Sequence, residues 1–160
     1  MKIIIIGNSG SGKTWLARRI SKVCRIPHIP LDRIFWEPGG YNSKRTDLEV
    51  NTDLKQIQDS RSWIVEGVFG HLADQLTSFS DILIFMNLSW DECRRNLMNR
   101  DSESSKQLDP VTAEQNFESL LVWASEYEIR KSKASRKYHC FLYDKISLRN
   151  VKPTPLRLRS

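Results

Sequence analysis

The stretch Lys2–Thr14 constrains the fold of this chain more than any other. Four consecutive isoleucines, Ile3–Ile6, run into a loop of small residues that ends at Gly12, Lys13 and Thr14. Four β-branched residues in a row are typical of a strand buried on both faces, as in a parallel sheet. The loop completes the pattern G-x-x-x-x-G-K-[ST], which is typical of phosphate binding. We therefore expect a strand, a phosphate-binding loop and then a helix.

Each part of the predicted loop has a chemical role. Its glycines let successive backbone N–H groups point at one anion, and the helix that starts at Lys13 adds its positive end. We expect Lys13 to reach the β- and γ-phosphates of ATP, and the Thr14 hydroxyl to bind Mg²⁺. The alternative is a glycine-rich turn that matches the pattern by accident. The residues predicted to bind the nucleotide are Gly7, Asn8, Ser9, Gly10, Ser11, Gly12, Lys13 and Thr14.

Apolar patterns after the loop predict alternating strands and helices. Strands are expected at 3–6, 26–31, 63–67, 81–88 and 155–159, the last at an edge. Helices are expected at 13–23, after the capping box at Thr46–Glu49, after a second capping box at Ser89–Glu92 as far as 100, and at 110–130 and 135–146. This alternation predicts an α/β fold of three layers, α/β/α, with a parallel sheet of about five strands and helices on both faces.

Composition limits the organisation and the partners of the chain. A length of 160 residues predicts one domain, residues 1–160, and no apolar run approaches the length of a membrane helix. No secretory signal precedes the first strand, so we expect a cytoplasmic protein. The net charge of +6, with a basic run at 130–137, indicates a nucleic-acid partner, a site for a small polyanion, or a solvated face. The polar segment 101–109 is expected to be a mobile surface segment.

Two carboxylates follow predicted strands and would converge on the phosphate loop if the first strand is central. Asp32 follows the second strand, and Glu66 ends the third. Because Mg²⁺ beside phosphates is usually held by one or two carboxylates and water, we interpret Glu66 as a metal ligand. Asp32 is interpreted as the base or the acceptor-binding group. The alternatives are an N-cap for Asp32 and a carboxylate bound by backbone N–H groups for Glu66.

Three arginines follow the fourth predicted strand. A transferring phosphoryl group spreads its charge over several oxygens and calls for cations, and Arg94, Arg95 and Arg100 are the nearest candidates. Neighbouring residues of a helix differ by about 100°, so Arg94 and Arg95 cannot both face the site. We predict Arg95 or Arg94, together with Arg100, as catalytic residues. Ordinary surface charge is the alternative for each.

Histidines and aromatic residues give weaker signals. His28 and His71 are candidates for contacts with an acceptor, and His139 is expected to be a surface or half-buried residue. Aromatic residues that could line an acceptor pocket, or belong to the core, are Phe35, Trp36 and Tyr41.

Together these motifs resemble the nucleoside-monophosphate-kinase-like branch of P-loop proteins, which includes adenylate, shikimate and gluconate kinases. The closer resemblance is to small bacterial adenylate-kinase-related proteins that are labelled DNA topology modulation proteins. The residues that carry it are Gly7–Thr14, Leu31–Trp36, Trp63–Gly67, Asp81–Leu88 with the arginine-bearing helix after it, and Trp123 and Tyr127. The resemblance implies a sheet in the order 2-3-1-4-5, a short lid at about 101–109, and transfer of the γ-phosphoryl group from ATP·Mg²⁺ to a small acceptor.

The sequence departs from this family on the acceptor side. The third strand of these kinases usually ends Asp-Gly, whereas this chain has Glu66 and Gly67. Adenylate kinases also carry an arginine shortly after that glycine to grip the phosphate of the acceptor, whereas the segment 68–71 here offers only His71. This departure argues against ordinary AMP kinase activity.

Two functions follow from these observations. The leading hypothesis is a small-molecule kinase that uses ATP and Mg²⁺, with Lys13 and the arginines stabilising the transition state. Asp32 would bind or deprotonate the hydroxyl of a nucleotide-like or other small acceptor. The rival hypothesis is a nucleotide-dependent nucleic-acid-binding protein whose basic C-terminal third contacts phosphates. The sequence contains no helix-turn-helix or other recognisable reading motif, which counts against the rival.

Overall fold

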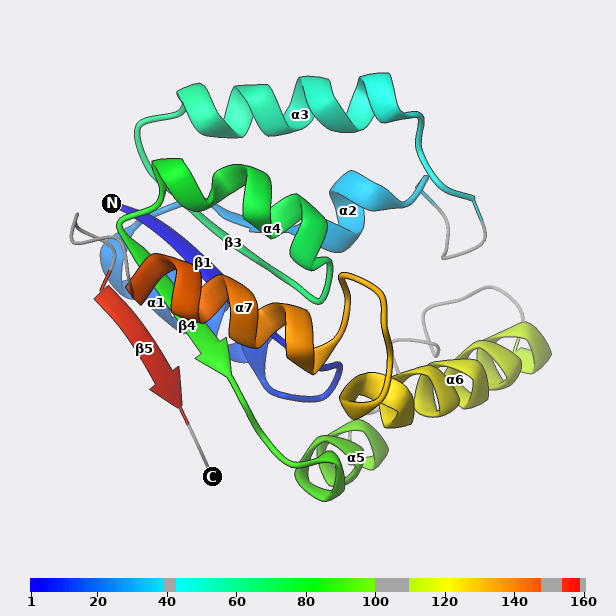
Figure 1. The fold of residues 1–160 in the computed structure, drawn as a ribbon. Coiled ribbons are helices and arrows are strands. Elements are labelled where there is room, and N and C mark those ends of the chain that lie inside the picture. The colour runs from blue at the N-terminus through cyan, green and yellow to red at the C-terminus, as the bar shows by residue number, and fades with distance from the viewer. Residues whose placement is uncertain (39–42, 100–109, 148–153, 159–160) are drawn as a thin grey trace.

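A parallel sheet forms the centre of the computed structural model, which describes residues 1–38, 43–99, 110–147 and 154–158. Its five strands lie in the order β2-β3-β1-β4-β5, and every neighbouring pair is parallel (Figure 1). The strands are Lys2–Gly7 (β1), His28–Pro30 (β2), Trp63–Gly67 (β3), Ile82–Met86 (β4) and Thr154–Leu158 (β5). The predicted order is confirmed, and β1 lies at the centre of the sheet.

Helices cover both faces of this sheet, so the predicted three-layer α/β/α fold is also confirmed. The helix α1 packs on one face, and α2, α3, α4 and α7 pack on the other. The helices are Lys13–Cys24 (α1), Leu31–Phe35 (α2), Asp47–Asp59 (α3), Gly70–Leu76 (α4), Trp90–Met98 (α5), Pro110–Ser125 (α6) and Arg136–Ser147 (α7), with short 3₁₀ turns at Thr77–Phe79 (η1) and Glu126–Glu128 (η3). Within the described ranges, none of these helices has the length and apolar character that spanning a membrane requires.

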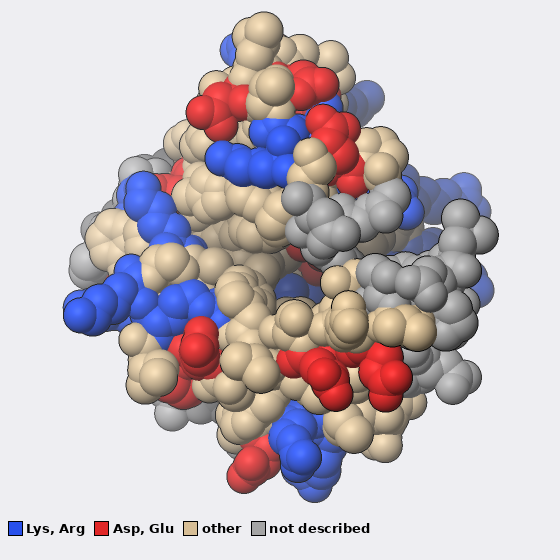
Figure 2. All heavy atoms as spheres, turned by 90° about the vertical axis from the view of Figure 1, so that its right-hand side faces the viewer, with Lys and Arg blue, Asp and Glu red and all other residues tan. Residues whose placement is uncertain are grey.

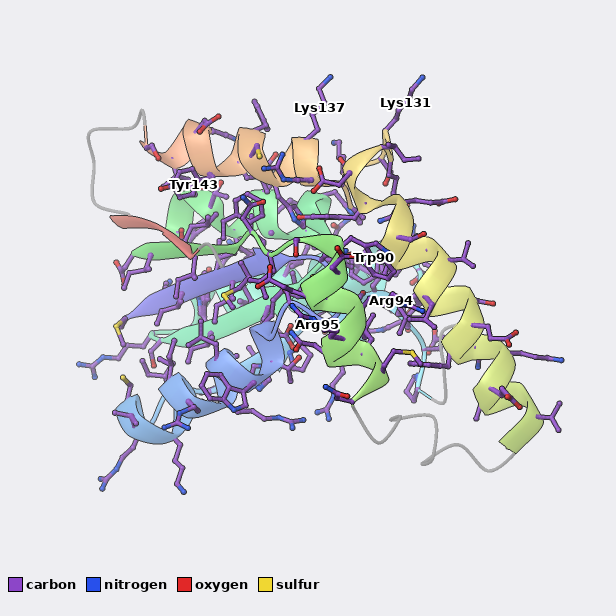
Figure 3. The ribbon with its side chains drawn as sticks, turned by 90° about the horizontal axis from the view of Figure 1, so that it is seen from below. Trp90, Arg94, Arg95, Lys131, Lys137 and Tyr143 are labelled. Atoms are coloured by element: carbon purple, nitrogen blue, oxygen red, sulfur yellow. The ribbon has the colours of Figure 1, made fainter. Side chains whose placement is uncertain are left out.

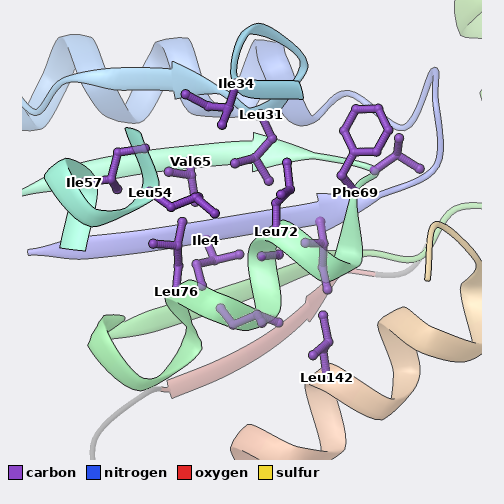
Figure 4. Close-up of a cluster of buried hydrophobic side chains, with 14 of the residues drawn as sticks. Ile4, Leu31, Ile34, Leu54, Ile57, Val65, Phe69, Leu72, Leu76 and Leu142 are labelled. Atoms are coloured by element: carbon purple, nitrogen blue, oxygen red, sulfur yellow. The ribbon is translucent and has the colours of Figure 1, made fainter. Parts of the chain in front are cut away.

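The four isoleucines of β1 divide between two cores. Ile3 and Ile5 pack in the cluster under α1, whereas Ile4 and Ile6 pack in the larger cluster on the opposite face. Since side chains alternate across a strand, a continuous apolar run suits a strand that is covered on both sides. Each of the four is at most 2% exposed, and burying one such side chain contributes roughly 1.5–3 kcal/mol. Figure 4 shows the larger cluster, with Ile4 among leucines of α3 and α4.

Both predicted capping boxes are present. The Thr46 side chain accepts a hydrogen bond from the backbone N–H of Glu49, whose carboxylate accepts from the Thr46 N–H in return. Ser89 and Glu92 make the same pair of bonds at the start of α5. The inner face of α3 is buried as the apolar spacing predicts. Local sequence therefore accounts for where these two helices begin.

Several predicted boundaries differ from the structure, among them the strand predicted at 81–88, which is observed as Ile82–Met86. The second strand is shorter than predicted, because Pro30 ends β2 and residues 31–35 turn into a helix instead of extending the strand. The helix after Ser89 ends at Met98 and not at residue 100. The helix predicted to run to Arg130 stops at Ser125, where a 3₁₀ turn begins that buries Tyr127. The predicted lid 101–109 and Arg100 lie outside the described residues.

Candidate functional site

The phosphate-loop motif forms a tight turn between β1 and α1. Gly10 and Gly12 have φ angles of 79° and 87°, which lie in the left-handed region that favours glycine. A side chain at Gly10 would also collide with the backbone carbonyl of Cys93 in α5. The Asn96 side chain of α5 donates a hydrogen bond to the Gly10 carbonyl at 2.8 Å. The loop is therefore held by a helix that comes more than eighty residues later in the chain.

Asn8 ties the beginning of the loop to the end of α6. Its Nδ2 donates to the backbone carbonyl of Ala124 at 2.9 Å, and its Oδ1 accepts from the backbone N–H of Ser9 at 2.8 Å. The side chain is only 2% exposed, so both bonds are made away from water. The end of α6 consequently lies directly against the loop.

Two polar groups of the loop point to an anion as its ligand. Lys13 is buried, and its Nζ donates to the Asn8 carbonyl at 2.6 Å. The hydroxyl of Ser11 is buried and has no hydrogen-bond partner among the described residues. A buried hydroxyl without a partner is costly, so a partner from a ligand would stabilise it. The N-terminus of α1, the lysine and this hydroxyl together suit the oxygens of a phosphate.

Glu66 and Thr14 meet beside the loop. The Thr14 Oγ1 donates to Glu66 Oε1 at 3.0 Å, and His28 Nε2 lies 3.4 Å from the same carboxylate oxygen. Glu66 is 4% exposed, and its carboxylate accepts this hydrogen bond from the loop threonine away from the surface. The described residues contain no group of three or more His, Cys, Asp or Glu side chains that could hold a metal. Two oxygens are nevertheless enough for Mg²⁺, which retains several waters.

Asp32 lies at the carboxyl end of β2, in the first turn of α2, where it is half-buried. The N-cap of α2 is Pro30, so the alternative in which Asp32 caps this turn is wrong. Because β2 pairs with β3 through Pro30 and Glu66, the elements that carry Asp32 and Glu66 are adjacent at this edge of the sheet. The strand order thus brings the ends of β2 and β3, which carry the two carboxylates, to the same edge of the sheet.

An aromatic cluster follows Asp32 along the chain. The rings of Phe35 and Phe69 stack with centroids 4.3 Å apart, Trp36 meets Phe35 edge-on at 4.7 Å, and His71 meets Phe35 edge-on at 5.6 Å. Phe35 and Trp36 are half-buried and pack against the larger core. The cluster therefore belongs partly to the core and partly to the surface near Asp32. Tyr41, the third predicted aromatic residue, lies outside the described residues.

The arginines of α5 lie away from the face that contacts the loop. That face carries Cys93, Asn96 and Leu97, through their contacts with Gly10. At about 100° per residue, Arg94 lies on the flank of this face and Arg95 lies nearly opposite to it. Both side chains are exposed, with Arg94 on the side toward α6 and Arg95 on the side toward α1 (Figure 3).

The basic run 130–137 divides into inward and outward side chains. Arg130 stacks on Trp123, and Arg136 donates to the Asn87 Oδ1 at 2.9 Å. Lys131 and Lys137 are exposed and project away from the body of the protein (Figure 3). The run therefore does not form one continuous basic face.

Figure 2 looks onto the edge at which the strands end. The described surface is hollowed at its centre, with acidic and basic atoms visible at the base of the hollow. Parallel sheets bind their ligands beyond the carboxyl ends of their strands, and the phosphate loop and Glu66 lie at this end of the sheet.

His139 is a buried residue and not the surface or half-buried one that its helix predicts. It is 0% exposed, its Nδ1 lies 2.5 Å from the Tyr127 hydroxyl, and its Nε2 lies 3.0 Å from the Val68 carbonyl. Burial is the main reason that its pKa falls to about 3, and the nearby charges of Lys13 and Arg130 lower it further. The imidazole is therefore neutral near pH 7 and links α7 to the residue that follows β3.

Because the imidazole of His139 is neutral in the folded state, we expect the protein to be less stable at acidic pH. The folded pKa of about 3 lies below the ordinary histidine pKa of 6.5, so the unfolded chain binds more protons between these values. Stability therefore falls as the pH drops from about 6.5 toward 3. Between pH 7 and pH 5 we expect His139 to remove about 2 kcal/mol from the free energy of unfolding. Urea denaturation at both pH values should show this loss, and His139→Gln should abolish most of it.

The control for this measurement is His71→Gln. The pKa of His71 is also lowered, chiefly by burial, but His71 is only half-buried. Its replacement should leave most of the difference between pH 7 and pH 5 in place. Equal pH dependence in the parent and in His139→Gln would show that His139 is not the group responsible.

Several contacts of this site have no local sequence signal. Asn8 and Ala124 are 116 positions apart, and Gly10 and Asn96 are 86 apart. Asn96 is one polar residue among several on its helix. Only the packing of α5 and α6 against the loop shows that these residues belong to the site.

Comparison with known proteins supports the fold. No protein-family profile matches the chain, and no curated protein matches it. A gluconokinase from Sinorhizobium meliloti 1021 has a similar structure, with a TM-score of 0.51 and 15% sequence identity over 99% of this chain and 81% of the other. An uncharacterized protein from Eubacterium ventriosum ATCC 27560 gives a TM-score of 0.47 at 15% identity over 93% of this chain and 99% of the other.

A third similar structure is a sugar kinase from Janibacter sp. HTCC2649, with a TM-score of 0.46 at 16% identity over 75% of this chain and 76% of the other. At such identities a structural likeness shows the fold alone, and of these three structures the gluconokinase has the highest TM-score. The fold is thus P-loop kinase-like. The narrower resemblance to adenylate-kinase-related DNA topology modulation proteins stays a prediction.

Proposed function

We propose that this protein is a small-molecule kinase that transfers the γ-phosphoryl group of ATP to a hydroxyl of a small acceptor. The proposal rests on the geometry of the loop. The buried Ser11 hydroxyl has no hydrogen-bond partner among the described residues, and the hydrogen-bonded pair Thr14–Glu66 lies beside it. A loop of this kind binds phosphate. The oxygens of Thr14 and Glu66 beside it suit the divalent cation that accompanies a nucleoside triphosphate. When bound, ATP and Mg²⁺ would supply the transferable group and part of its charge neutralisation.

On the side of the site that would bind the donor ATP, different residues would contact the phosphates and the metal. Lys13 would exchange its bond to the Asn8 carbonyl for phosphate oxygens, so that its charge lies where negative charge develops. The Thr14 hydroxyl and the Glu66 carboxylate would hold the metal, directly or through water. Of the two arginines on α5, Arg94 is the better candidate for a contact with the transferring group, because Arg95 lies nearly opposite the face that holds Gly10.

The acceptor side would depend on Asp32. Its carboxylate would accept a hydrogen bond from the attacking hydroxyl and take its proton as the new oxygen–phosphorus bond forms. The half-buried aromatic cluster around Phe35 and Phe69 would form one wall of the acceptor site. The structurally similar gluconokinase is named for a hydroxyl-bearing substrate, and this supports an acceptor of that kind here.

The nucleic-acid hypothesis has weaker support. Two arginines of the basic run make contacts within the protein, through Trp123 and Asn87, which leaves fewer cations for a phosphate backbone. If nucleic acid is nevertheless the partner, its binding should weaken steeply with salt and respond to ATP. Binding that does not respond to nucleotide would count against that hypothesis.

The proposed function can be tested by a thermal-shift screen in two steps. The first step compares ATP, GTP and ADP with and without Mg²⁺. The second step adds nucleoside, sugar and hydroxy-acid acceptors in the presence of a non-hydrolysable ATP analogue. A ligand that binds only the folded state raises the melting temperature by mass action, so a true donor and acceptor should each produce a concentration-dependent rise. A protein whose melting temperature responds to no nucleotide would contradict the proposal.

A further inference from the structure

Arg130 is held in one orientation by two contacts within the protein. Its guanidinium carbon lies 3.7 Å from the centre of the Trp123 ring, and its Nη1 donates to the Ala134 carbonyl at 2.7 Å. The ring sets the plane of the guanidinium, and the carbonyl sets its rotation within that plane. The remaining Nη2 is buried and has no hydrogen-bond partner among the described residues.

This arginine differs from the other partly buried arginines of the protein. Arg45 lies 2.6 Å from Asp53, and Arg136 lies 3.4 Å from Glu128, so each has a carboxylate beside it. Within the described part of the chain, Arg130 makes no such ion pair. Burial lowers its pKa, and the charge of Glu126 only partly opposes this. A buried charge is normally paired with an opposite charge, because leaving water without a partner is costly. The guanidinium is therefore held in place by the ring and the carbonyl, while its Nη2 donates to no described residue.

The position of Arg130 puts it at the phosphate loop. Trp123, on which it stacks, is next to Ala124, whose carbonyl accepts the hydrogen bond from Asn8. Tyr127, three positions before Arg130, contacts the His139 ring, which in turn contacts the Val68 carbonyl just after β3. The connection between η3 and α7 passes the carboxyl ends of the central strands (Figure 1). The segment that carries Arg130 therefore lies at the same end of the sheet as the loop, the end where ligands bind.

We propose that Arg130 is an anion-binding residue of this site, and that its Nη2 donates to an oxygen of a phosphoryl or carboxylate group of a ligand bound at the Gly7–Thr14 loop. The inference rests on the proposed function, since it requires an anionic ligand at that loop. A guanidinium suits this role because it presents paired donors in a fixed plane to an oxyanion. The oxyanion has two sources with the same chemistry, the γ-phosphoryl group of the donor and an anionic group of the acceptor.

Isothermal titration calorimetry on the full chain, at fixed ionic strength, tests the proposal. The ligands are ATP, ADP, and inorganic phosphate added to the ADP-loaded protein. The variants are Arg130→Gln and Arg130→Lys, with Lys131→Gln as the matched control because it removes one charge from an exposed neighbouring side chain. We expect Arg130→Gln to weaken binding of the contacted anion by about tenfold or more, and Arg130→Lys to have a smaller effect.

The ligands distinguish the two sources. Weaker binding of ATP with unchanged binding of ADP would assign Arg130 to the γ-phosphoryl group. Unchanged binding of both nucleotides, with loss of phosphate binding to the ADP-loaded protein, would assign it to the acceptor. If Arg130→Gln does not fold, as judged by circular dichroism, the same comparisons are made with Arg130→Lys.

Two outcomes would overturn the assignment of Arg130. One is unchanged affinity for all three ligands in the Arg130 variants. The other is an equal loss of affinity in Lys131→Gln, since this would reflect general charge and not a specific contact. In both cases the unaltered protein still binds nucleotide. If the unaltered protein binds neither ATP nor ADP, the proposed function itself fails, and the two failures are thus distinguishable.

Discussion

Lys13→Met is expected to reduce phosphoryl transfer by about a thousandfold or more, because cations placed on a transferring phosphoryl group contribute effects of this size. Methionine retains much of the length of the side chain and loses only the charge and the donor. The lost bond to the Asn8 carbonyl should cost about 1 kcal/mol of stability, too little to unfold the domain. The measurement is the initial rate of transfer from ATP to an acceptor identified by thermal shift, or of slow ATP hydrolysis.

The matched control is Lys22→Met. Lys22 lies on the same helix, is exposed, and is nine positions beyond Lys13. Its replacement removes the same charge from α1 and should leave the rate within about twofold of the parent, as expected for a screened surface charge. A Lys13→Met protein that retains the parental rate while remaining folded would show that the loop does not act on the reacting phosphoryl group.

Asp32→Asn is expected to reduce transfer by about 10²- to 10⁴-fold while the affinity for ATP stays nearly unchanged, because a general base contributes to transfer and not to donor binding. Asparagine has the same shape as aspartate and can still hydrogen-bond the acceptor, but it cannot take a proton at neutral pH. The rate of transfer and the dissociation constant for ATP are measured on the same preparation. This pair of results would separate the acceptor side of the site from the donor side.

Asp47→Asn serves as the control for this variant. Asp47 lies in the first turn of α3, as Asp32 lies in the first turn of α2, and its side chain is exposed. The control accounts for the loss of a negative charge near a helix N-terminus, which is worth about 0.3–1 kcal/mol of stability. Unchanged transfer in Asp32→Asn would remove Asp32 from the proposed mechanism, and a large loss of ATP affinity would place it on the donor side instead.

Local sequence patterns predicted much of the fold because they act over a few residues. Two capping boxes identified where α3 and α5 begin, and the apolar run of β1 identified a strand covered on both faces. The predictions failed where tertiary contacts decide the structure. A helix predicted to reach Arg130 ends at Ser125, and His139 is buried. His139 in α7 hydrogen-bonds to Tyr127 in η3 and to Val68 in the segment after β3.

The sequence by itself determined the donor half of the candidate site. The glycines of the loop, Lys13 and Thr14 are contiguous, and the φ angles that the loop requires are a property of the glycines themselves. Asp32 and Glu66 could also be predicted, since parallel strands bring their carboxyl ends to one edge. Local chain geometry and strand order are therefore sufficient for this half.

Only the tertiary structure decided which other side chains join the loop. Asn96 holds Gly10 from α5, Ala124 binds Asn8 from the end of α6, and Arg130 is stacked on Trp123 beside them. These partners are far apart in sequence, and nothing in their local surroundings distinguishes Arg130 from the exposed lysines of the same run. The distinction comes from burial, because the buried Nη2 of the half-buried Arg130 has no hydrogen-bond partner among the described residues, whereas an exposed ammonium is hydrated by water.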